Sequence, residues 1–166
     1  RILDIGGNSG EFGLRICRKH PGAHVTVFDL PLVCEIGEEH IKNEPEAKRL
    51  SFVRGNGLID PLPNGFDCIT FKSMLHDWPE KEAGRFIERA VQSLNPGGAL
   101  LIFERESLDF QDRIPPFSLI PFLLFFRSFR SSAIYENHLR EAGLREVCTK
   151  HIRLETGFHL ITGKRV

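Results

Sequence analysis

The sequence predicts an α/β fold with a mostly parallel sheet of seven strands. Short runs rich in β-branched and aromatic residues alternate with longer runs of helical character along the chain. A glycine-rich turn joins the first apolar run directly to the first helical run. No internal repeat or low-complexity tract interrupts the alternation. These observations favour one domain that spans residues 1–166.

The first elements are marked by their boundaries. The predicted strands cover residues 2–5, 24–28, 50–54, 66–71, 99–103, 146–152 and 159–162. One helix follows Gly10 and ends near residues 19–22, where lysine and histidine precede a Pro-Gly stop. The next helix begins near Pro31, because proline suits the first turn of a helix.

A third helix follows Trp78 and has the clearest pattern. Its apolar residues recur at i, i+3 and i+4 spacing and form one face: Ala83, Phe86, Ile87, Ala90, Val91 and Leu94. Residues 95–98, Asn-Pro-Gly-Gly, end this helix. A fourth helix begins at a cap, Ser131 or Ser132, and stops before Gly143.

Composition excludes several classes of protein. Lys+Arg and Asp+Glu both total 22, so bulk charge offers nothing to hold a nucleic acid. The four cysteines lie far apart and form no CxxC pair, which argues against a disulfide framework or a zinc site and favours a reduced, cytoplasmic setting. No signal peptide or run of transmembrane length is visible, so we expect no membrane partner.

The turn after the first strand predicts a nucleotide-like cofactor. Gly6, Gly7 and Gly10 let the backbone approach a ligand, and the helix behind them offers free N–H groups. Asn8 stands where the dinucleotide fingerprint G-x-G-x-x-G needs its second glycine. The looser pattern suits S-adenosylmethionine, which has no pyrophosphate, and Asp4 suits its cationic amino-acid end. A tight turn without a ligand is the alternative.

Polar residues after the next two strands extend this predicted site. Asp29 ends the second strand, where a carboxylate can accept hydrogen bonds from both ribose hydroxyls. It can also cap the helix that begins near Pro31. Asn56 follows the third strand, where it reads an adenine edge or forms an ordinary turn with Gly57.

Five motifs together resemble one family. They are residues 3–7 (LDIGG), 28–31 (FDLP), 71–78 (FKSMLHDW), 94–98 (LNPGG) followed by Glu104, and 139–144 (LREAGL). Over essentially its whole length, the chain is similar to the catalytic domain of the caffeate/hydroxyindole type of S-adenosylmethionine-dependent O-methyltransferase. The resemblance implies a Rossmann-like class I methyltransferase fold, with helices on both faces of the sheet.

The resemblance also implies which residues hold S-adenosylmethionine. The matching positions are Gly6, Asp29, Asn56, Gly57 and Lys72, and Asp4, Gly7 and Leu30 complete the predicted cofactor residues. The family usually has Asp-Met or Asp-Phe where this chain has Asn56-Gly57. Asparagine keeps the capacity to form hydrogen bonds, but Gly57 removes a side chain that would pack against the adenine.

His76 is implied as the catalytic base. A phenol has a pKa of about 10 and attacks a sulfonium methyl group well only when deprotonated, and histidine titrates near neutrality. A histidine that only packs or caps is the alternative. Asp77 is a further candidate, but Asp77 and Glu80 also form a capping box for the third helix, which we expect to be its main role. We expect Trp78 in the core, and no metal is needed.

Two glutamates flank the histidine in the resembling family. Glu104 matches one of them, and a carboxylate there would orient the imidazole and favour its protonated form. The second glutamate precedes an Arg-Thr pair, but here Phe129 stands at that position, before Arg130-Ser131. This departure puts the two-glutamate mechanism in doubt, and Glu106 is a candidate substitute.

Residues 115–129 hold five of the 14 phenylalanines and line the acceptor pocket in the family. An aromatic wall suits a flat or lipophilic acceptor. Core packing, or burial against another region or subunit, is the alternative. Family members are homodimers through an N-terminal helical region; residue 1 already lies in a predicted core strand, so we expect that region to be missing here.

We therefore expect methyl transfer from S-adenosylmethionine to a hydroxyl of a small aromatic or polyketide-like molecule, as in secondary metabolism. Three alternatives stay open. The chain could be a relative with non-methyl chemistry, such as hydroxylation or decarboxylation. It could methylate nitrogen or carbon, or bind the cofactor without turnover.

Overall fold

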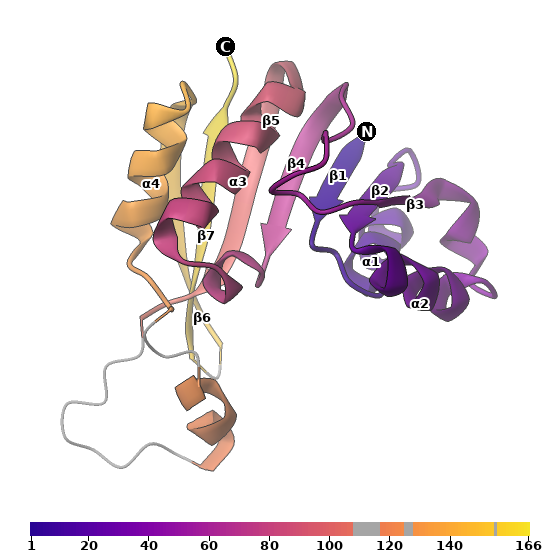
Figure 1. The fold of residues 1–166 in the computed structure, drawn as a ribbon, viewed down its shortest axis with the longest axis horizontal. Helices are drawn as coiled ribbons and strands as arrows, with labels where there is room; N and C mark the ends of the chain where they lie inside the picture. The colour runs from indigo at the N-terminus through magenta and orange to yellow at the C-terminus, as the bar shows by residue number, and fades with distance from the viewer. Residues whose placement is uncertain (108–116, 125–127, 155) are drawn as a thin grey trace.

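A computed structural model describes residues 1–107, 117–124, 128–154 and 156–166 (Figure 1). The strands are β1 (Ile2–Ile5), β2 (Val25–Asp29), β3 (Leu50–Arg54), β4 (Phe66–Lys72), β5 (Leu94–Arg105), β6 (Arg145–Arg153) and β7 (Gly157–Lys164). The helices are α1 (Glu11–Lys19), α2 (Pro31–Ile41), α3 (Glu80–Ser93) and α4 (Ser132–Glu141). Short 3-10 helices are η1 (Pro45–Arg49), η2 (Leu75–Asp77) and η3 (Phe117–Leu124).

The strands form one sheet in the order β3-β2-β1-β4-β5-β7-β6. Strands β1 to β5 run parallel, and β7 runs antiparallel to both β5 and β6. The predicted α/β class and mostly parallel sheet are confirmed. The order reverses between β1 and β4, and in such sheets the crevice at the carboxyl ends of the strands beside this reversal is where ligands bind.

Helices cover both faces of the sheet because successive side chains of a strand point to opposite faces. Val25 and Val27 of β2 belong to a core cluster with Leu14 of α1. The next residue, Phe28, belongs to a larger cluster that includes Ile87 of α3. Figure 1 shows α1 and α2 beside β1 to β3, and α3 and α4 beside β4 to β7. None of the described helices has the length and apolar character needed to cross a membrane.

The predicted loop at residues 95–98 is instead the beginning of β5. Helix α3 ends at Ser93, and β5 starts at the next residue. The cause is pairing with the chain after β7: the Gly97 N–H donates to the Arg165 carbonyl at 2.8 Å, and the Arg165 N–H donates to the Gly98 carbonyl at 2.8 Å. Gly97 has φ +78°, which a residue with a side chain rarely adopts.

The predicted capping box at Asp77 is wrong. The residue before α3 is Pro79, in an extended conformation, and no side chain caps the helix. Because Pro79 sets the start of the helix, Asp77 lies two residues too early and belongs to η2. Ser131 does precede α4 as predicted, but its side chain makes no cap hydrogen bond.

Candidate active site

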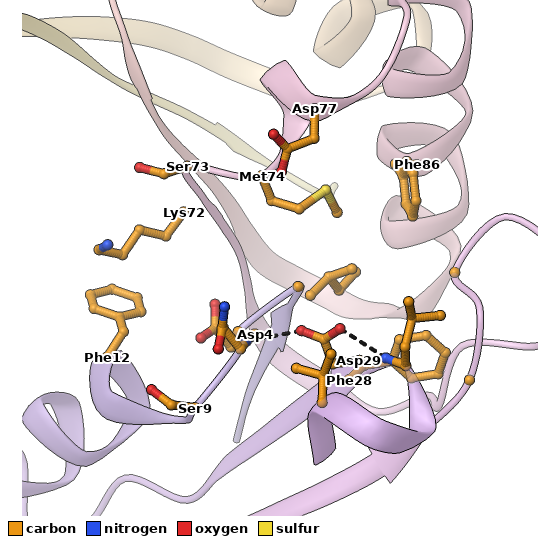
Figure 2. A pocket seen from close by; sticks show the side chains of 18 of the residues that line it. Asp4, Ser9, Phe12, Phe28, Asp29, Lys72, Ser73, Met74, Asp77 and Phe86 are labelled. Carbon is orange, nitrogen blue, oxygen red and sulfur yellow. Dashed lines mark hydrogen bonds between the residues drawn. The ribbon is translucent and has the colours of Figure 1, made fainter. Parts of the chain in front are cut away.

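A cavity of about 960 Å³ lies at the carboxyl ends of β1, β2, β3 and β4 (Figure 2). We call it the first cavity. The structure places all eight predicted cofactor residues on its wall: Asp4, Gly6, Gly7, Asp29, Leu30, Asn56, Gly57 and Lys72. The sequence separates these residues widely, and the parallel sheet brings them to one edge.

The glycine turn exposes its backbone to close approach by a ligand, and side chains would not fit at these positions. Gly6 has φ +70°, and a Cβ on it would lie 2.5 Å from Met74 Cγ. A Cβ on Gly7 would lie 2.5 Å from Asp4 Oδ2. Gly10, at φ +78°, is the N-cap of α1 and makes the left-handed turn into the helix. The turn is therefore built for backbone contact with whatever fills the first cavity.

Asp29 lies where β2 ends, and its carboxylate holds the turn in place. Oδ2 accepts a hydrogen bond from the Asn8 N–H at 2.9 Å, and Oδ1 accepts one from the Leu30 N–H at 2.8 Å (Figure 2). The alternative prediction, that Asp29 is the N-cap of the next helix, is wrong, because Leu30 is the N-cap of α2. Each carboxylate oxygen has a further lone pair, so Asp29 can accept two more hydrogen bonds from a ligand.

Asp4 is a buried carboxylate on the wall of the first cavity, with 1% of its surface exposed. Oδ1 accepts a hydrogen bond from Thr70 Oγ1 at 2.6 Å, whereas Oδ2 has no hydrogen-bond partner among the described residues. Burial raises the pKa of Asp4 from 3.8 to about 6, against the opposing effects of Thr70 and Lys72. An orphaned buried oxygen of this kind fits a ligand with a cationic or N–H donor end.

Asn56 forms a turn and also lines the first cavity. Its Oδ1 accepts a hydrogen bond from the Leu58 N–H at 3.0 Å, and its own N–H donates to Asp60 Oδ2 at 2.8 Å. The ordinary turn is thus present, and its oxygen is committed to the backbone. At Gly57, a Cβ would lie 2.6 Å from the Phe86 ring. Phe86 therefore occupies the space that a larger residue 57 would need, and it supplies an aromatic wall in its place.

Several other residues of the first cavity were missed from the sequence. Phe12 is the second residue of α1, and its ring centroid lies 5.7 Å from Lys72 Nζ. Met74 and Phe86 also line the cavity, although Phe86 was assigned to the core from its helical spacing. Trp78 packs against Phe86, with ring centroids 5.2 Å apart, and lines the same cavity. The one feature of the sequence that could have identified Phe12 is its place in the first helical turn after the glycines.

Glu104, at the end of β5, fixes the segment that carries His76. Its exposed fraction is 1%. Oε1 accepts hydrogen bonds from the N–H groups of Met74, at 2.9 Å, and Leu75, at 2.8 Å. Oε2 lies 2.9 Å from His76 Nδ1. One buried carboxylate thus holds both the backbone of η2 and the imidazole ring.

The environment of His76 raises its pKa. Burial lowers the pKa, but the hydrogen bond and charge of Glu104, with the charge of Asp77, outweigh it. Asp77 Oδ1 lies 3.4 Å from His76 Nε2, on the side of the ring away from Glu104. The structure therefore brings the three predicted catalytic residues, His76, Asp77 and Glu104, into one group.

A second cavity, of about 260 Å³, adjoins this group. Its lining, among the described residues, is Ser73, His76, Glu104, Arg105, Phe122, Phe129 and Phe158. Ser73 lines both cavities, so the two meet beside it. Arg105 lies with its guanidinium carbon 3.9 Å from the Phe122 ring centroid and 4.6 Å from that of Phe158.

The ring of Phe129 packs against His76, the candidate catalytic base, and cannot form the ion pair that a carboxylate could. The ring centroids of His76 and Phe129 lie 5.0 Å apart. Glu106, the candidate substitute for the second family glutamate, does not take that place, because it lies 2.8 Å from His151. In the phenylalanine-rich segment, Phe122 and Phe129 line the second cavity. Phe117 is exposed, and Pro115, Pro116, Phe125 and Phe126 lie outside the described residues.

The chain is similar to known proteins over most of its length. A family model described as an O-methyltransferase domain matches residues 1–144. The chain is 32% identical over 152 residues to a 3-hydroxy-5-methyl-1-naphthoate 3-O-methyltransferase of Streptomyces sahachiroi, covering 90% of this chain and 44% of that protein. The chain thus spans less than half the length of this relative.

Solved structures share the fold over 99% of this chain. The S-adenosylmethionine-dependent methyltransferase SibL, in its apo form, matches with a TM-score of 0.85, 25% identity and half of its own length covered. Human N-acetylserotonin methyltransferase, solved in complex with S-adenosylmethionine, matches with a TM-score of 0.76 and 27% identity, and 47% of that chain is covered.

Proposed function

Because the chain belongs to the family of S-adenosylmethionine-dependent O-methyltransferases, we propose that it methylates a hydroxyl of a small aromatic or polyketide-like molecule. The observation that carries the proposal is the position of His76. It is held by a buried carboxylate and lines the second cavity, and Asp77, whose Oδ1 lies 3.4 Å from its Nε2, lines the first.

The first cavity fits S-adenosylmethionine. The orphaned Oδ2 of Asp4 suits the cationic amino-acid end of the cofactor, and the open lone pairs of Asp29 suit its ribose hydroxyls. The aromatic rings of Phe28 and Phe86 on the wall suit a planar base. When bound, S-adenosylmethionine supplies an electrophilic methyl group on a sulfonium sulfur.

His76 acts as the general base in this proposal. In the neutral tautomer whose Nδ1–H donates a hydrogen bond to Glu104, the lone pair is on Nε2, which can take the proton of the acceptor hydroxyl. Asp77, 3.4 Å from Nε2, then stabilises the imidazolium that forms. Asp77 thus supplies the second carboxylate that Phe129 does not provide.

The second cavity suits a flat acceptor. Three phenylalanine rings line it, and a planar aromatic molecule buries well against such surfaces. The naphthoate O-methyltransferase reported above is named for a substrate of this shape. Transfer to oxygen is favoured over the alternatives with nitrogen, carbon or non-methyl chemistry, because the family model and this relative are both O-methyltransferases.

Cofactor binding is tested by calorimetric titration of the purified full chain with S-adenosylmethionine and S-adenosylhomocysteine. Asp29→Ala removes hydrogen bonds to a charged group, so we expect affinity to fall by about tenfold or more. Glu38→Ala is the matched control, because Glu38 lies on α2 and its carboxylate pairs with Arg54 at 2.7 Å, away from the first cavity. No binding to the unaltered full chain would contradict the proposed function.

We also propose that the working protein is a cytoplasmic homodimer whose second subunit is joined through a region outside these 166 residues. The resemblance to the family supports this proposal. Sedimentation equilibrium of the full-length protein tests it, and a monomer at micromolar concentration would contradict it.

A further inference from the structure

A second group of ionisable side chains lies where β5, β6 and β7 come together. Glu106 follows β5, His151 lies on β6 and His159 lies on β7. One potential ligand atom from each lies within 4.8 Å of the others. None of the three lines the first or second cavity. The cluster does not share a cavity with the candidate active site, but it lies next to it, because His159 is the direct strand partner of Glu104.

Strand pairing sets the positions of these three residues. His151 and His159 are direct partners in the antiparallel pair β6–β7. Such partners carry their side chains on the same face, with Cβ atoms about 5 Å apart. The Glu106 N–H donates to the Gly157 carbonyl at 3.0 Å and so continues the β5–β7 ladder. Two donors therefore come from paired strands, and the third follows directly after the neighbouring strand β5.

The donors lie close enough together to share one metal ion. Glu106 Oε1 lies 2.8 Å from His151 Nδ1 and 3.6 Å from His159 Nδ1. Ligands at zinc–nitrogen and zinc–oxygen bond lengths of about 2.1 Å are separated by about 3.4 Å along a tetrahedral edge. The two measured distances lie on either side of that value, so small side-chain movements would complete the geometry.

His159 is the residue that points most clearly to a ligand. Only 4% of its surface is exposed, and neither ring nitrogen forms a hydrogen bond of ordinary geometry with the described residues, the Arg130 backbone being at most a weak partner of one of them. Leaving a buried polar group without a partner costs about 1–3 kcal/mol, so such groups normally have one. Gly157 makes room for the neighbouring carboxylate, since a Cβ there would lie within 2.1 Å of Glu106 Oε2.

We propose that Glu106, His151 and His159 bind a divalent transition metal ion of the zinc type, with solvent at the remaining position. Two imidazoles and one carboxylate suit Zn²⁺, Co²⁺ or Ni²⁺ and not Mg²⁺ or Ca²⁺, which prefer oxygen donors. In each neutral ring the proton resides on Nε2, and the Nδ1 lone pair binds the metal. His151 is 66% exposed, so the ion can enter from solvent. The bound ion ties β5 to the β6–β7 pair.

Metal titration of the full chain tests this proposal. The protein is stripped with a chelator, dialysed, and titrated with Co²⁺ followed by visible absorption, and with Zn²⁺ followed by calorimetry. We expect one equivalent of either ion to bind, and Zn²⁺ to displace Co²⁺. Mg²⁺ should give no signal.

Variants locate the ion. His151→Gln removes an exposed ligand without disturbing the core, and should weaken Zn²⁺ binding by more than about tenfold. Gly157→Ala displaces the Glu106 carboxylate and should do the same. His40→Gln is the control, because His40 is also an exposed histidine beside a glutamate, with Nε2 3.5 Å from Glu11 Oε2. Binding of less than one equivalent, or equal affinity in His151→Gln, would overturn the proposal. The assay uses no methyl transfer, so its failure leaves the proposed function untouched.

Discussion

At the scale of single residues, the candidate active site depends most on Glu104. This carboxylate accepts two backbone hydrogen bonds from η2 and lies 2.9 Å from His76 Nδ1. It therefore fixes the position of the histidine and also its charge. The family's second glutamate is replaced by Phe129, so no carboxylate at that position shares this task.

Replacement of Glu104 by glutamine removes the charge, and it also places an amide nitrogen where a carboxylate oxygen faced His76 Nδ1. Glutamine can still accept backbone hydrogen bonds, but it lacks the charge that raises the pKa of His76 above the lowering effect of burial. His76 would then lose its proton at lower pH. We expect the acid limb of the pH profile of kcat/KM to move down by about 1 unit or more in Glu104→Gln. An acid limb at the same pH in wild type and Glu104→Gln would show that this limb does not report the titration of His76.

The burial of Asp4 leads to a different prediction, which concerns the free energy of unfolding. Its pKa is raised by burial from 3.8 to about 6, so the stability linked to its protonated form is present below pH 3.8 and is lost as pH rises through about 6. A shift of this size corresponds to about 3 kcal/mol. Wild-type protein should therefore lose about 2–2.5 kcal/mol of it relative to Asp4→Asn between pH 4 and pH 7.5, because at pH 4 the unfolded-state carboxyl is already partly ionised.

Urea unfolding of both proteins at the two pH values measures this difference. Other groups titrate alike in both proteins, so their contributions cancel. An equal pH dependence in wild type and Asp4→Asn would contradict a buried, ionisable Asp4.

Asp4→Asn should also bind S-adenosylmethionine more weakly, because it lacks the carboxylate charge that we propose to face the cationic end of the cofactor.

At the scale of elements, α3 anchors the sheet beside the site. Its apolar face was predicted from i, i+3 and i+4 spacing, and Ile87 on that face is fully buried. We expect Ile87→Ala to lower the free energy of unfolding by about 2–5 kcal/mol. Ile59→Ala is the matched control, because Ile59 is 75% exposed and should change stability by less than about 0.5 kcal/mol. Equal effects in chemical denaturation would contradict the packing described for α3.

The elements that were predicted well have strong local causes. Strand β1 and helix α1 follow from an apolar run, a glycine turn and a cationic last turn, and the predicted and observed bounds agree closely. The cap of α3 was predicted wrongly because Pro79 sets the start of that helix. The start of β5 was predicted wrongly for a different reason. Pairing of Gly97 and Gly98 with Arg165 depends on a contact with the far end of the chain, which no local pattern contains.

At the scale of the whole molecule, the site exists because sheet order gathers residues from distant parts of the chain. The sequence motifs identified the eight residues placed on the first cavity wall and the group around His76. They did not identify Phe86 opposite Gly57, nor the approach of Glu106, His151 and His159. Those contacts require the three-dimensional course of α3 and the pairing of β5, β6 and β7.

In the proposed reaction, His76 takes a proton from an acceptor hydroxyl. The most direct measurement is the rate of product formation by wild type and His76→Gln at saturating S-adenosylmethionine, with a panel of hydroxylated naphthoates and phenols followed by mass spectrometry. We predict an O-methylated product from wild type, and a rate lower by about 10²–10⁴-fold in His76→Gln with unchanged cofactor affinity. Methyl transfer at the wild-type rate by His76→Gln would contradict the account.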